Sequence, residues 1–251
     1  MDISVVLITK NEAHIIENTL KSLLPFFTDI IIVDSGSTDG TIAICKKFNT
    51  VIIETGWHGY GVNKNMGIAA AKNNWILSLD ADEAIDNALK QSLMGLTLQN
   101  EAEVFEIKFK NFFCNKWIRF GEWGFDSHIR LFNRKNVTWN NVAVHENLIF
   151  PGTVKVSKLK GYILHYTVQS RKEYFLKTDY YARMNAKKYH AAGKQASILK
   201  QYISPVFAFI QHYIFRLGFL DGAEGFIIAK TTAHYTFLKY KYLKAMNNNK
   251  T

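Results

Sequence analysis

Four short apolar runs alternate with helix-like segments in the first 80 residues, and this alternation constrains the fold more than any other feature of the sequence. The runs span residues 3–8, 30–33, 51–53 and 75–79. Continuous apolar runs of this length are typical of strands that are buried on both faces. Strands that alternate with helices form right-handed crossovers, so the sequence predicts an α/β fold with a parallel sheet.

Polar residues follow the predicted strands. Asp80 and Asp82 come directly after the run at 75–79. Ligands bind beyond the carboxyl ends of parallel strands, and carboxylate oxygens suit Mg²⁺ or Mn²⁺, which would bring a phosphorylated substrate. The alternative is that these acids cap a helix that starts near Asp86. The polar groups at the three strand ends are Thr9, Asn11, Glu12, Asp34, Asp80 and Asp82.

Two common nucleotide-binding motifs are missing from the sequence. The first predicted strand ends at residues 9–12 without the glycine-rich turn of a dinucleotide-binding fold. The segment 59–64 contains glycines but lacks the Gly-Lys-Ser/Thr ending of a P-loop. In their place, Lys64 could neutralise a phosphate, and Asp34 could accept hydrogen bonds from a ribose or a base edge.

Four ordered blocks together resemble the family-two inverting glycosyltransferases of the GT-A fold. They are residues 5–12, 33–41, 64–65 and 79–83. Shorter pieces later in the chain resemble the bacterial subgroup that adds glucose to the inner core of lipopolysaccharide. These pieces are residues 130–132, 144–146, 165–166 and 218–222. The resemblance implies a GT-A (nucleotide-diphospho-sugar transferase) domain with a mostly parallel central sheet flanked by helices, a UDP-sugar donor and a divalent cation.

The resemblance also implies roles for single residues. Thr9, Glu12 and Asp34 would surround the uridine, with Asn11 in the same polar set. Lys64 and Asp80 would lie near the ribose and the diphosphate. Asp82 would hold the metal that bridges both phosphates. His165, at the end of a predicted strand, would complete the metal site, and its imidazole would favour Mn²⁺ over Mg²⁺; the alternative is a structural histidine.

Inverting transfer needs a general base that takes the proton of the acceptor hydroxyl. Glu146 is the preferred candidate and Asp126 the second, because both acids lie beyond the donor-binding half of the sequence. The alternative for each is a salt bridge to Arg130 or Arg134.

The second half of the chain contains further predicted strands and then helices. The strands are residues 104–109, 129–132 and 159–166, and the chain is predicted to be helical from about residue 170. Ser204 and Pro205 predict the start of a helix, Gly222 predicts a stop, and a further helix is predicted at about 225–243. The predicted domains are therefore a catalytic domain at 1–168, with a nucleotide-sugar half at 1–100 and an acceptor half at 101–168, and a basic helical region at 169–251.

Charge is distributed unevenly along the chain. Residues 1–150 carry a net charge of −3 and residues 151–251 a net charge of +13. A basic region of this kind suits an anionic surface, and lysines beside tyrosines at 225–243 are typical of an interfacial helix. The alternative is that the helices pack on the sheet with a solvated basic face. The run at 206–220 is too short and too polar to span a bilayer comfortably.

The sequence thus predicts an enzyme that moves glucose or a similar hexose from a UDP-sugar to a lipid-linked saccharide such as the heptose of the lipopolysaccharide inner core. We expect it to lie in the cytoplasm, peripherally on the anionic inner face of the bacterial membrane, with no nucleic-acid partner. The two cysteines and the absence of a signal-peptide pattern agree with that compartment. The alternatives are nucleotidyl transfer to a sugar phosphate and a non-catalytic basic module that binds membrane or nucleic acid.

Overall fold

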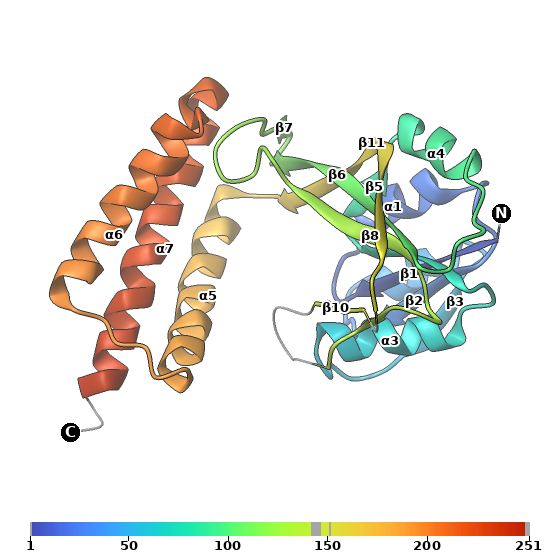
Figure 1. Cartoon of the computed structure of the whole chain (residues 1–251), viewed down its shortest axis with the longest axis horizontal. Coiled ribbons are helices and arrows are strands. Elements are labelled where there is room, and N and C mark those ends of the chain that lie inside the picture. Colours follow the sequence, from blue (N-terminus) through green and yellow to red (C-terminus); the bar gives the residue numbers. More distant parts are fainter. Residues whose placement is uncertain (1, 142–146, 151, 249–251) are drawn as a thin grey trace. The chain divides into compact units, whose positions relative to one another are not determined.

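The computed structural model describes residues 2–141, 147–150 and 152–248. The chain forms two compact units (Figure 1). The sheet unit comprises Met1–Phe109 and Ser127–His165, and the helical unit comprises Lys110–Asp126 and Tyr166–Thr251. The segment 110–126, which we expected in the acceptor half of the catalytic domain, therefore belongs to the helical unit.

The first four strands of the sheet unit are parallel, as the alternating sequence predicted. They lie in the order β3-β2-β1-β4, and the two central strands β1 and β2 are buried at every residue. The strands are β1 (Ile3–Thr9), β2 (Ile30–Asp34), β3 (Val51–Glu54) and β4 (Trp75–Asp80), and the helices between them are α1 (Ile16–Leu23), α2 (Thr41–Cys45) and α3 (Tyr60–Ala70).

The sheet continues beyond β4 with antiparallel neighbours, in the order β4-β8-β6-β11-β5. The pairs β4–β8, β6–β8 and β5–β11 are antiparallel, which makes the sheet mixed and confirms the α/β class. The three strands predicted after residue 100 correspond to β6, β8 and β11. The elements are β5 (Glu83–Ile85), α4 (Asn87–Met94), β6 (Glu103–Phe113), β7 (Lys116–Trp117), β8 (Ser127–Asn133), β9 (Thr138–Trp139), β10 (Leu148–Ile149) and β11 (Lys155–Val168).

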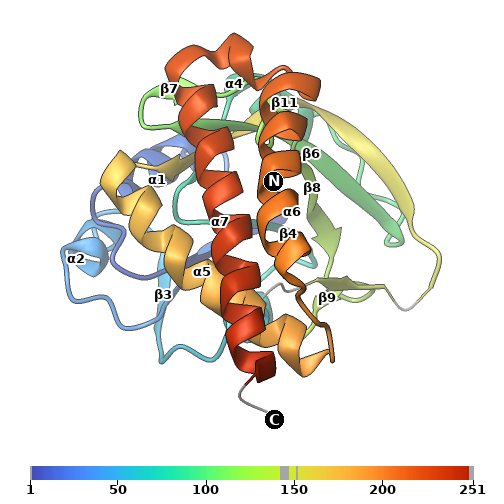
Figure 2. The ribbon, with the colours of Figure 1, turned by 90° about the vertical axis from the view of Figure 1, so that its left-hand side faces the viewer.

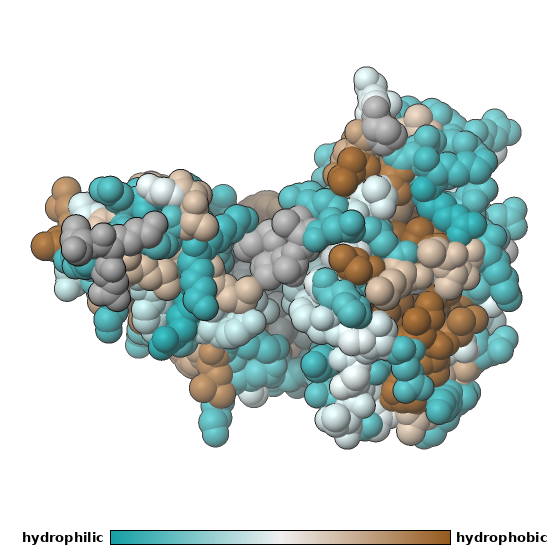
Figure 3. All heavy atoms as spheres, turned by 90° about the horizontal axis from the view of Figure 1, so that it is seen from below, coloured by the Kyte–Doolittle hydropathy of each residue, from teal (hydrophilic) through white to brown (hydrophobic). Residues whose placement is uncertain are grey.

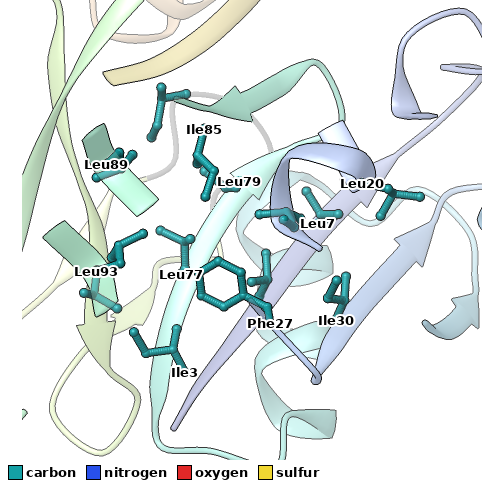
Figure 4. Packing of buried hydrophobic residues seen from close by; sticks show 14 of the residues in the cluster. Ile3, Leu7, Leu20, Phe27, Ile30, Leu77, Leu79, Ile85, Leu89 and Leu93 are labelled. Atoms are coloured by element: carbon teal, nitrogen blue, oxygen red, sulfur yellow. The ribbon is translucent and has the colours of Figure 1, made fainter. Parts of the chain in front are cut away.

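One hydrophobic core joins β1 and β4 to α1 and α4 (Figure 4). Leu7 of β1, Leu20 of α1 and Leu77 of β4 are each 0% exposed. Burial of a leucine side chain contributes roughly 1.5–3 kcal/mol, so this cluster is a major source of stability for the strands whose ends carry the polar residues.

Gly67 lets α3 pack closely on the opposite face of the sheet. A Cβ atom at this position would lie 2.5 Å from Cγ1 of Val6 and 2.9 Å from Cγ2 of Val33, closer than van der Waals contact. Residues three apart share one face of a helix, so Lys64 lies on the same sheet-facing side of α3 as Gly67. The close approach therefore holds Lys64 against the sheet.

The helical unit is built around one long helix. Helix α7 packs against both α5 and α6, and Figures 1 and 2 show it between them. The elements are α5 (Arg171–Ala191), α6 (Ile198–Ile210), a π-helical turn η1 (Gln211–Phe215), a 3₁₀ turn η2 (Gly218–Asp221) and α7 (Gly222–Asn248).

Asp221 connects the start of α7 to the segment that follows β7. It is 4% exposed, and Oδ2 accepts hydrogen bonds from the backbone N–H groups of Arg119 (3.1 Å) and Phe120 (2.8 Å). Its backbone carbonyl accepts a hydrogen bond from Lys116 Nζ at 2.5 Å. The 218–222 piece therefore has a structural role in the helical unit.

The predicted helix boundaries in this region were wrong. Helix α6 begins after Ser197, whose side chain accepts a hydrogen bond from the N–H of Lys200, so Pro205 lies inside the helix. The Ser197 cap satisfies the first turn, and one proline removes only one later hydrogen bond. Gly222, predicted as a stop, is the first residue of α7 because it links the 3₁₀ turn to that helix with φ +64°.

Candidate functional site

Three neighbouring parallel strands end in polar residues at one edge of the sheet unit. Strand β1 ends at Thr9, β2 at Asp34 and β4 at Asp80. The strand register places Thr9 level with Asp34, and Ile8 level with Asp80. The structure thus brings these three predicted site residues together.

Thr9 presents a hydroxyl that the fold leaves unsatisfied. The residue is 5% exposed, and Oγ1 has no hydrogen-bond partner among the described residues. A buried polar group without a partner costs about 1–3 kcal/mol, so a bound ligand that supplied one would be stabilised.

Asp34 and Asn11 shape the turn that follows β2. Oδ2 of Asp34 accepts hydrogen bonds from the backbone N–H groups of Gly36 (3.0 Å) and Ser37 (2.8 Å). Oδ1 of Asn11, a residue with φ +57°, accepts one from the N–H of Thr38 at 2.8 Å. Both predicted site residues therefore order the backbone at this edge.

Glu12 lies at the entry to α1. Its carbonyl accepts hydrogen bonds from the N–H groups of Ile15 (3.0 Å) and Ile16 (2.9 Å), and its own N–H donates to Oγ1 of Thr41 at 2.8 Å. Its carboxylate is 31% exposed and lies 3.7 Å from Nε2 of His14, so it remains accessible to solvent and to a ligand.

Lys64 places a buried positive charge at the end of β4. Its side chain is 2% exposed, and Nζ lies 3.2 Å from Oδ1 of Asp80. The same ammonium lies 4.5 Å from the centre of the Trp139 ring. A charge buried to this extent is stable only when it is paired, so Asp80 and the indole face fix the position of the ammonium.

Arg130 of β8 joins two acids at the same strand end. Its Nη2 lies 2.5 Å from Oε1 of Glu83 and 3.5 Å from Oδ2 of Asp80. Oε2 of Glu83 in turn accepts a hydrogen bond from the N–H of Asp80 at 3.0 Å. The Arg130 and Glu83 side chains are 9% and 1% exposed, so this ion pair is buried, whereas the Asp80 side chain is 31% exposed and reaches the surface.

The cations of this network keep Asp80 ionised. Burial alone would raise the pKa of Asp80. The Lys64 ammonium and the Arg130 guanidinium outweigh burial and hold the pKa of this carboxyl well below its usual range. Asp80 is therefore a carboxylate at any physiological pH.

Asp82 and His165 form a second pair beside the first. Antiparallel pairing of β5 with β11 places His165 level with Glu83, and Nε2 of His165 lies 3.4 Å from Oδ2 of Asp82. Both side chains are about one quarter exposed, at 24% and 25%. Burial lowers the pKa of His165, but the hydrogen bond and the negative charge of Asp82 outweigh it and raise the pKa to about 9.

The side chains of Asp82 and His165 could bind a divalent cation if phosphate oxygens of the substrate supply its other ligands. The described residues include no group of three or more His, Cys, Asp or Glu side chains arranged to hold a metal by themselves. A cation that binds a diphosphate needs only one or two protein ligands, because phosphate oxygens and water complete its shell. The Asp82 carboxylate and the His165 imidazole, 3.4 Å apart, supply such a set once the cation displaces the proton that the raised pKa of His165 retains, and an imidazole suits Mn²⁺.

The two acids that open this region do not cap the next helix. Asp86 is the N-cap of α4, and its side chain accepts a hydrogen bond from the N–H of Leu89 at 2.9 Å. The alternative interpretation of Asp80 and Asp82 as caps is therefore wrong, because Asp86 performs that function.

An open pocket of about 690 Å³ lies beside the Lys64–Asp80 pair. His128, Arg130 and Trp139 line it together with that pair. The indole Nε1 of Trp139 has no hydrogen-bond partner among the residues that the structure describes. A pocket with an aromatic wall and unsatisfied polar groups is suited to a sugar ring.

Of the two candidate bases, the structure describes Asp126 and not Glu146. Glu146 lies outside the described residues. Asp126 belongs to the helical unit, where its Oδ2 accepts a hydrogen bond from Nδ2 of Asn111 at 3.2 Å. Arg134, one suggested partner of these acids, donates from Nη1 to the carbonyls of Ile68 (2.9 Å) and Ala71 (2.7 Å).

Sequence reasoning did not assign a site role to Arg130 or pair it with Glu83. A single arginine within the apolar run at 129–132 is the signal that could have identified Arg130, because a charge in a buried strand needs a buried partner. The side chain of Glu83, next to Asp82, was the available partner. Nothing local in the sequence separates Trp139 from the other tryptophans.

The family model described as "Glycosyl transferase family 2" matches residues 4–149, which is more than half of the chain. The protein therefore belongs to glycosyl transferase family 2 and is a glycosyltransferase. The alternatives of a nucleotidyltransferase and of a non-catalytic binding module are not supported.

Two relatives agree with this family, and a solved structure agrees with the fold. The chain is 28% identical over 250 residues to the lipopolysaccharide core biosynthesis glycosyltransferase LpsC of Rhizobium meliloti, covering 95% of this chain and 90% of LpsC. It is 27% identical to an uncharacterized glycosyltransferase of Rickettsia bellii, covering 98% and 87% of the two chains. The structure of S. aureus TarS 1–349 in complex with UDP superposes with a TM-score of 0.50 at 15% identity, covering 100% and 92%, which supports the GT-A fold.

We expect Arg130→Met to lower the free energy of unfolding by about 3–5 kcal/mol, because it leaves the buried Glu83 carboxylate without its partner. Urea unfolding followed by circular dichroism measures the change. Lys135→Met is the matched control, since Lys135 is 53% exposed and pairs with the exposed Glu101, and it should cost less than about 1 kcal/mol. Equal losses in the two variants would contradict the buried network.

Proposed function

We propose that this glycosyltransferase moves glucose or a similar hexose from a UDP-sugar to a lipid-linked saccharide, such as the heptose of the lipopolysaccharide inner core, with inversion and with a divalent cation. The observation that carries the proposal is that the ion pair of the buried Lys64 with Asp80 and the Asp82–His165 pair lie together at one end of β4. Lys64 of the first pair supplies a fixed ammonium group, and the second pair supplies ligands for a cation. Both positive groups would offset the charge of a departing diphosphate.

The donor would bind along the edge formed by β1, β2 and β4. The unsatisfied Oγ1 of Thr9 and the turn ordered by Asp34 would receive the nucleoside, with Asn11 and Glu12 beside them. Lys64 would offset charge on the diphosphate, and Asp80 would orient Lys64 and meet the ribose. The UDP in the TarS structure supports this choice of nucleotide.

Asp82 and His165 would hold Mn²⁺ or Mg²⁺. When bound, the cation neutralises the negative charge that develops on the leaving diphosphate. Lys64 contributes to the same stabilisation from a position that the fold has already fixed, so little reorganisation is needed during the reaction.

The transfer itself would be a single displacement. A carboxylate takes the proton of the acceptor hydroxyl as its oxygen forms a bond to the anomeric carbon, and the bond from that carbon to the UDP oxygen breaks with its electron pair leaving on UDP. Glu146 is the proposed base, and Asp126 is the second candidate.

The acceptor and the location are parts of the same proposal. The relative LpsC is named for lipopolysaccharide core biosynthesis, which supports a lipid-linked saccharide as acceptor. An acceptor of this kind is held at a membrane, and the +13 charge of residues 151–251 suits an anionic cytoplasmic surface. We therefore place the enzyme peripherally on the inner face of the bacterial cytoplasmic membrane, without a nucleic-acid partner.

Asp82→Ala should abolish the increase in donor affinity that Mn²⁺ gives to the wild type, with a loss of at least about tenfold, because it removes the carboxylate ligand. Isothermal titration calorimetry with UDP-glucose, with and without Mn²⁺, measures this effect. Glu101→Ala is the control, since it removes one acid from an exposed pair outside the site. A wild type that binds no sugar nucleotide from a panel of UDP-hexoses would refute the proposed function.

Glu146→Gln should leave UDP-glucose binding unchanged and slow transfer by about 10²–10⁴-fold, because the amide cannot accept the proton. Calorimetry and a transfer assay on the same preparation separate the two effects. Asp126→Asn is the paired variant and should retain transfer. The reverse pattern, with slow transfer only in Asp126→Asn, would assign the base to Asp126.

A further inference from the structure

Helix α6 exposes a continuous apolar stripe. Its large hydrophobic residues recur in adjacent pairs four positions apart, which places them along one face of a helix. Each of them is between 55% and 67% exposed. The stripe consists of Ile198, Leu199, Tyr202, Ile203, Val206 and Phe207.

Helix α6 exposes its apolar face and buries a polar residue, which is the reverse of the usual orientation of a helix in water. The one buried residue of α6 is the polar Gln201, which is 7% exposed, while Phe207 is 61% exposed. A helix on the surface of a water-soluble protein turns its apolar side inward and its polar side outward. Hydrophobic atoms reach the surface of the helical unit in the view of Figure 3 as well. Such a face indicates a contact with an apolar phase or partner.

The exposed apolar surface continues into the turns that connect α6 to α7. Phe215 is 74% exposed and Leu220 is 54% exposed. Ile214, Leu217 and Phe219 are also exposed, by 43–50%. The apolar surface therefore includes both the helix and the connection after it, and is larger than one helix face.

The charged side chains that this segment exposes are all basic, because Asp221 at the end of η2 is only 4% exposed. Between residues 193 and 220 the chain contains Lys194, Lys200 and Arg216 and no Asp or Glu. Cations of this kind bind the anionic headgroups of a bilayer, and the apolar and aromatic side chains beside them insert at the boundary with the acyl chains. A second copy of the chain would bring the same cations against these, so charge favours a lipid surface over self-association.

The geometry favours a helix that lies along the membrane. Among the described residues no single helix is both long and apolar enough to cross a bilayer, and only the pair Ile198–Phe215 and Gly218–Asn248, bent by 71°, meets that criterion together. Helix α6 alone, with 13 residues, is about 20 Å long, whereas a hydrocarbon core is about 30 Å thick. Helix α7 packs against both α5 and α6 and buries Ile228 and Leu243.

We propose that α6 and the turns η1 and η2 form the membrane-docking surface of this protein, with the stripe inserted at the acyl boundary of an anionic bilayer. This assigns the interfacial role to α6, whereas the sequence pattern had pointed to residues 225–243. This proposal rests on the membrane association in the proposed function and names the surface that makes it. Its test uses no sugar nucleotide, so the docking surface and the donor site can fail independently of each other.

The test is flotation of the full chain with vesicles of phosphatidylcholine alone and of phosphatidylcholine mixed equally with phosphatidylglycerol. The wild type should float with the anionic vesicles, and less at high salt. The double variant Leu199→Glu and Phe207→Glu should bind at least about tenfold less, because it places two carboxylates in the stripe. Met94→Glu is the matched control, since Met94 is 51% exposed on α4 of the sheet unit, and it should float like the wild type.

A second measurement does not depend on a disruptive variant. The emission that Phe207→Trp adds to that of the five native tryptophans should be quenched by lipids with brominated acyl chains, and the emission that Met94→Trp adds should not. Equal flotation of the wild type and the double variant would overturn the proposal. So would a wild-type dimer, seen by light scattering, that the double variant dissociates while neither binds vesicles. Calorimetry with UDP-glucose on the double variant separates a failure of docking from a failure of the donor site.

Discussion

The parallel pairing of β1 with β2 and β4 is the constraint on which the rest of the site depends. It sets the ends of three buried strands level at one edge, and so places Thr9, Asp34 and Asp80 together. The apolar core beneath the strands supplies the stability, and the close packing at Gly67 keeps α3 against them. These contacts join protein groups to one another, so a ligand that binds at this edge would require little reorganisation.

The charges at this edge form a connected network in which each group has a different function. Asp80 binds two cations, Lys64 and Arg130, and its low pKa follows from them. Glu83 accepts from Arg130 and from the backbone of Asp80, which fixes the end of β4. Asp82, one residue away, is left to pair with His165 at the partly exposed side. The two aspartates therefore have different partners: Asp80 lies between Lys64 and Arg130, and Asp82 lies beside His165, with which we propose that it holds a cation.

Features that depend on local sequence could be predicted, and features that depend on distant pairing could not. The four parallel strands and the polar residues at their ends follow from short apolar runs and the acids after them. The contact of Asp82 with His165 requires antiparallel pairing between β5 and β11, about 80 positions apart in the chain, so the family resemblance and not a local pattern led us to expect the two residues in one site. The boundary predicted at Ser204 and Pro205 failed because the Ser197 cap and packing against α7 outweigh one proline. The partner of Arg130 could not be predicted, because it is set by the pairing of β8 with β4, which brings Arg130 beside Glu83.

The central claim is that the level strand ends form a donor site in which Asp82 shares a cation with a nucleoside diphosphate. A crystal structure of the protein with UDP and Mn²⁺, with anomalous diffraction data for manganese, tests it most directly. We predict a manganese peak at coordination distance, about 2.0–2.2 Å, from the Asp82 carboxylate, with the diphosphate beside Lys64 and the uridine along β1 and β2. UDP bound away from this edge, or an ordered diphosphate here with no manganese at Asp82, would contradict the account.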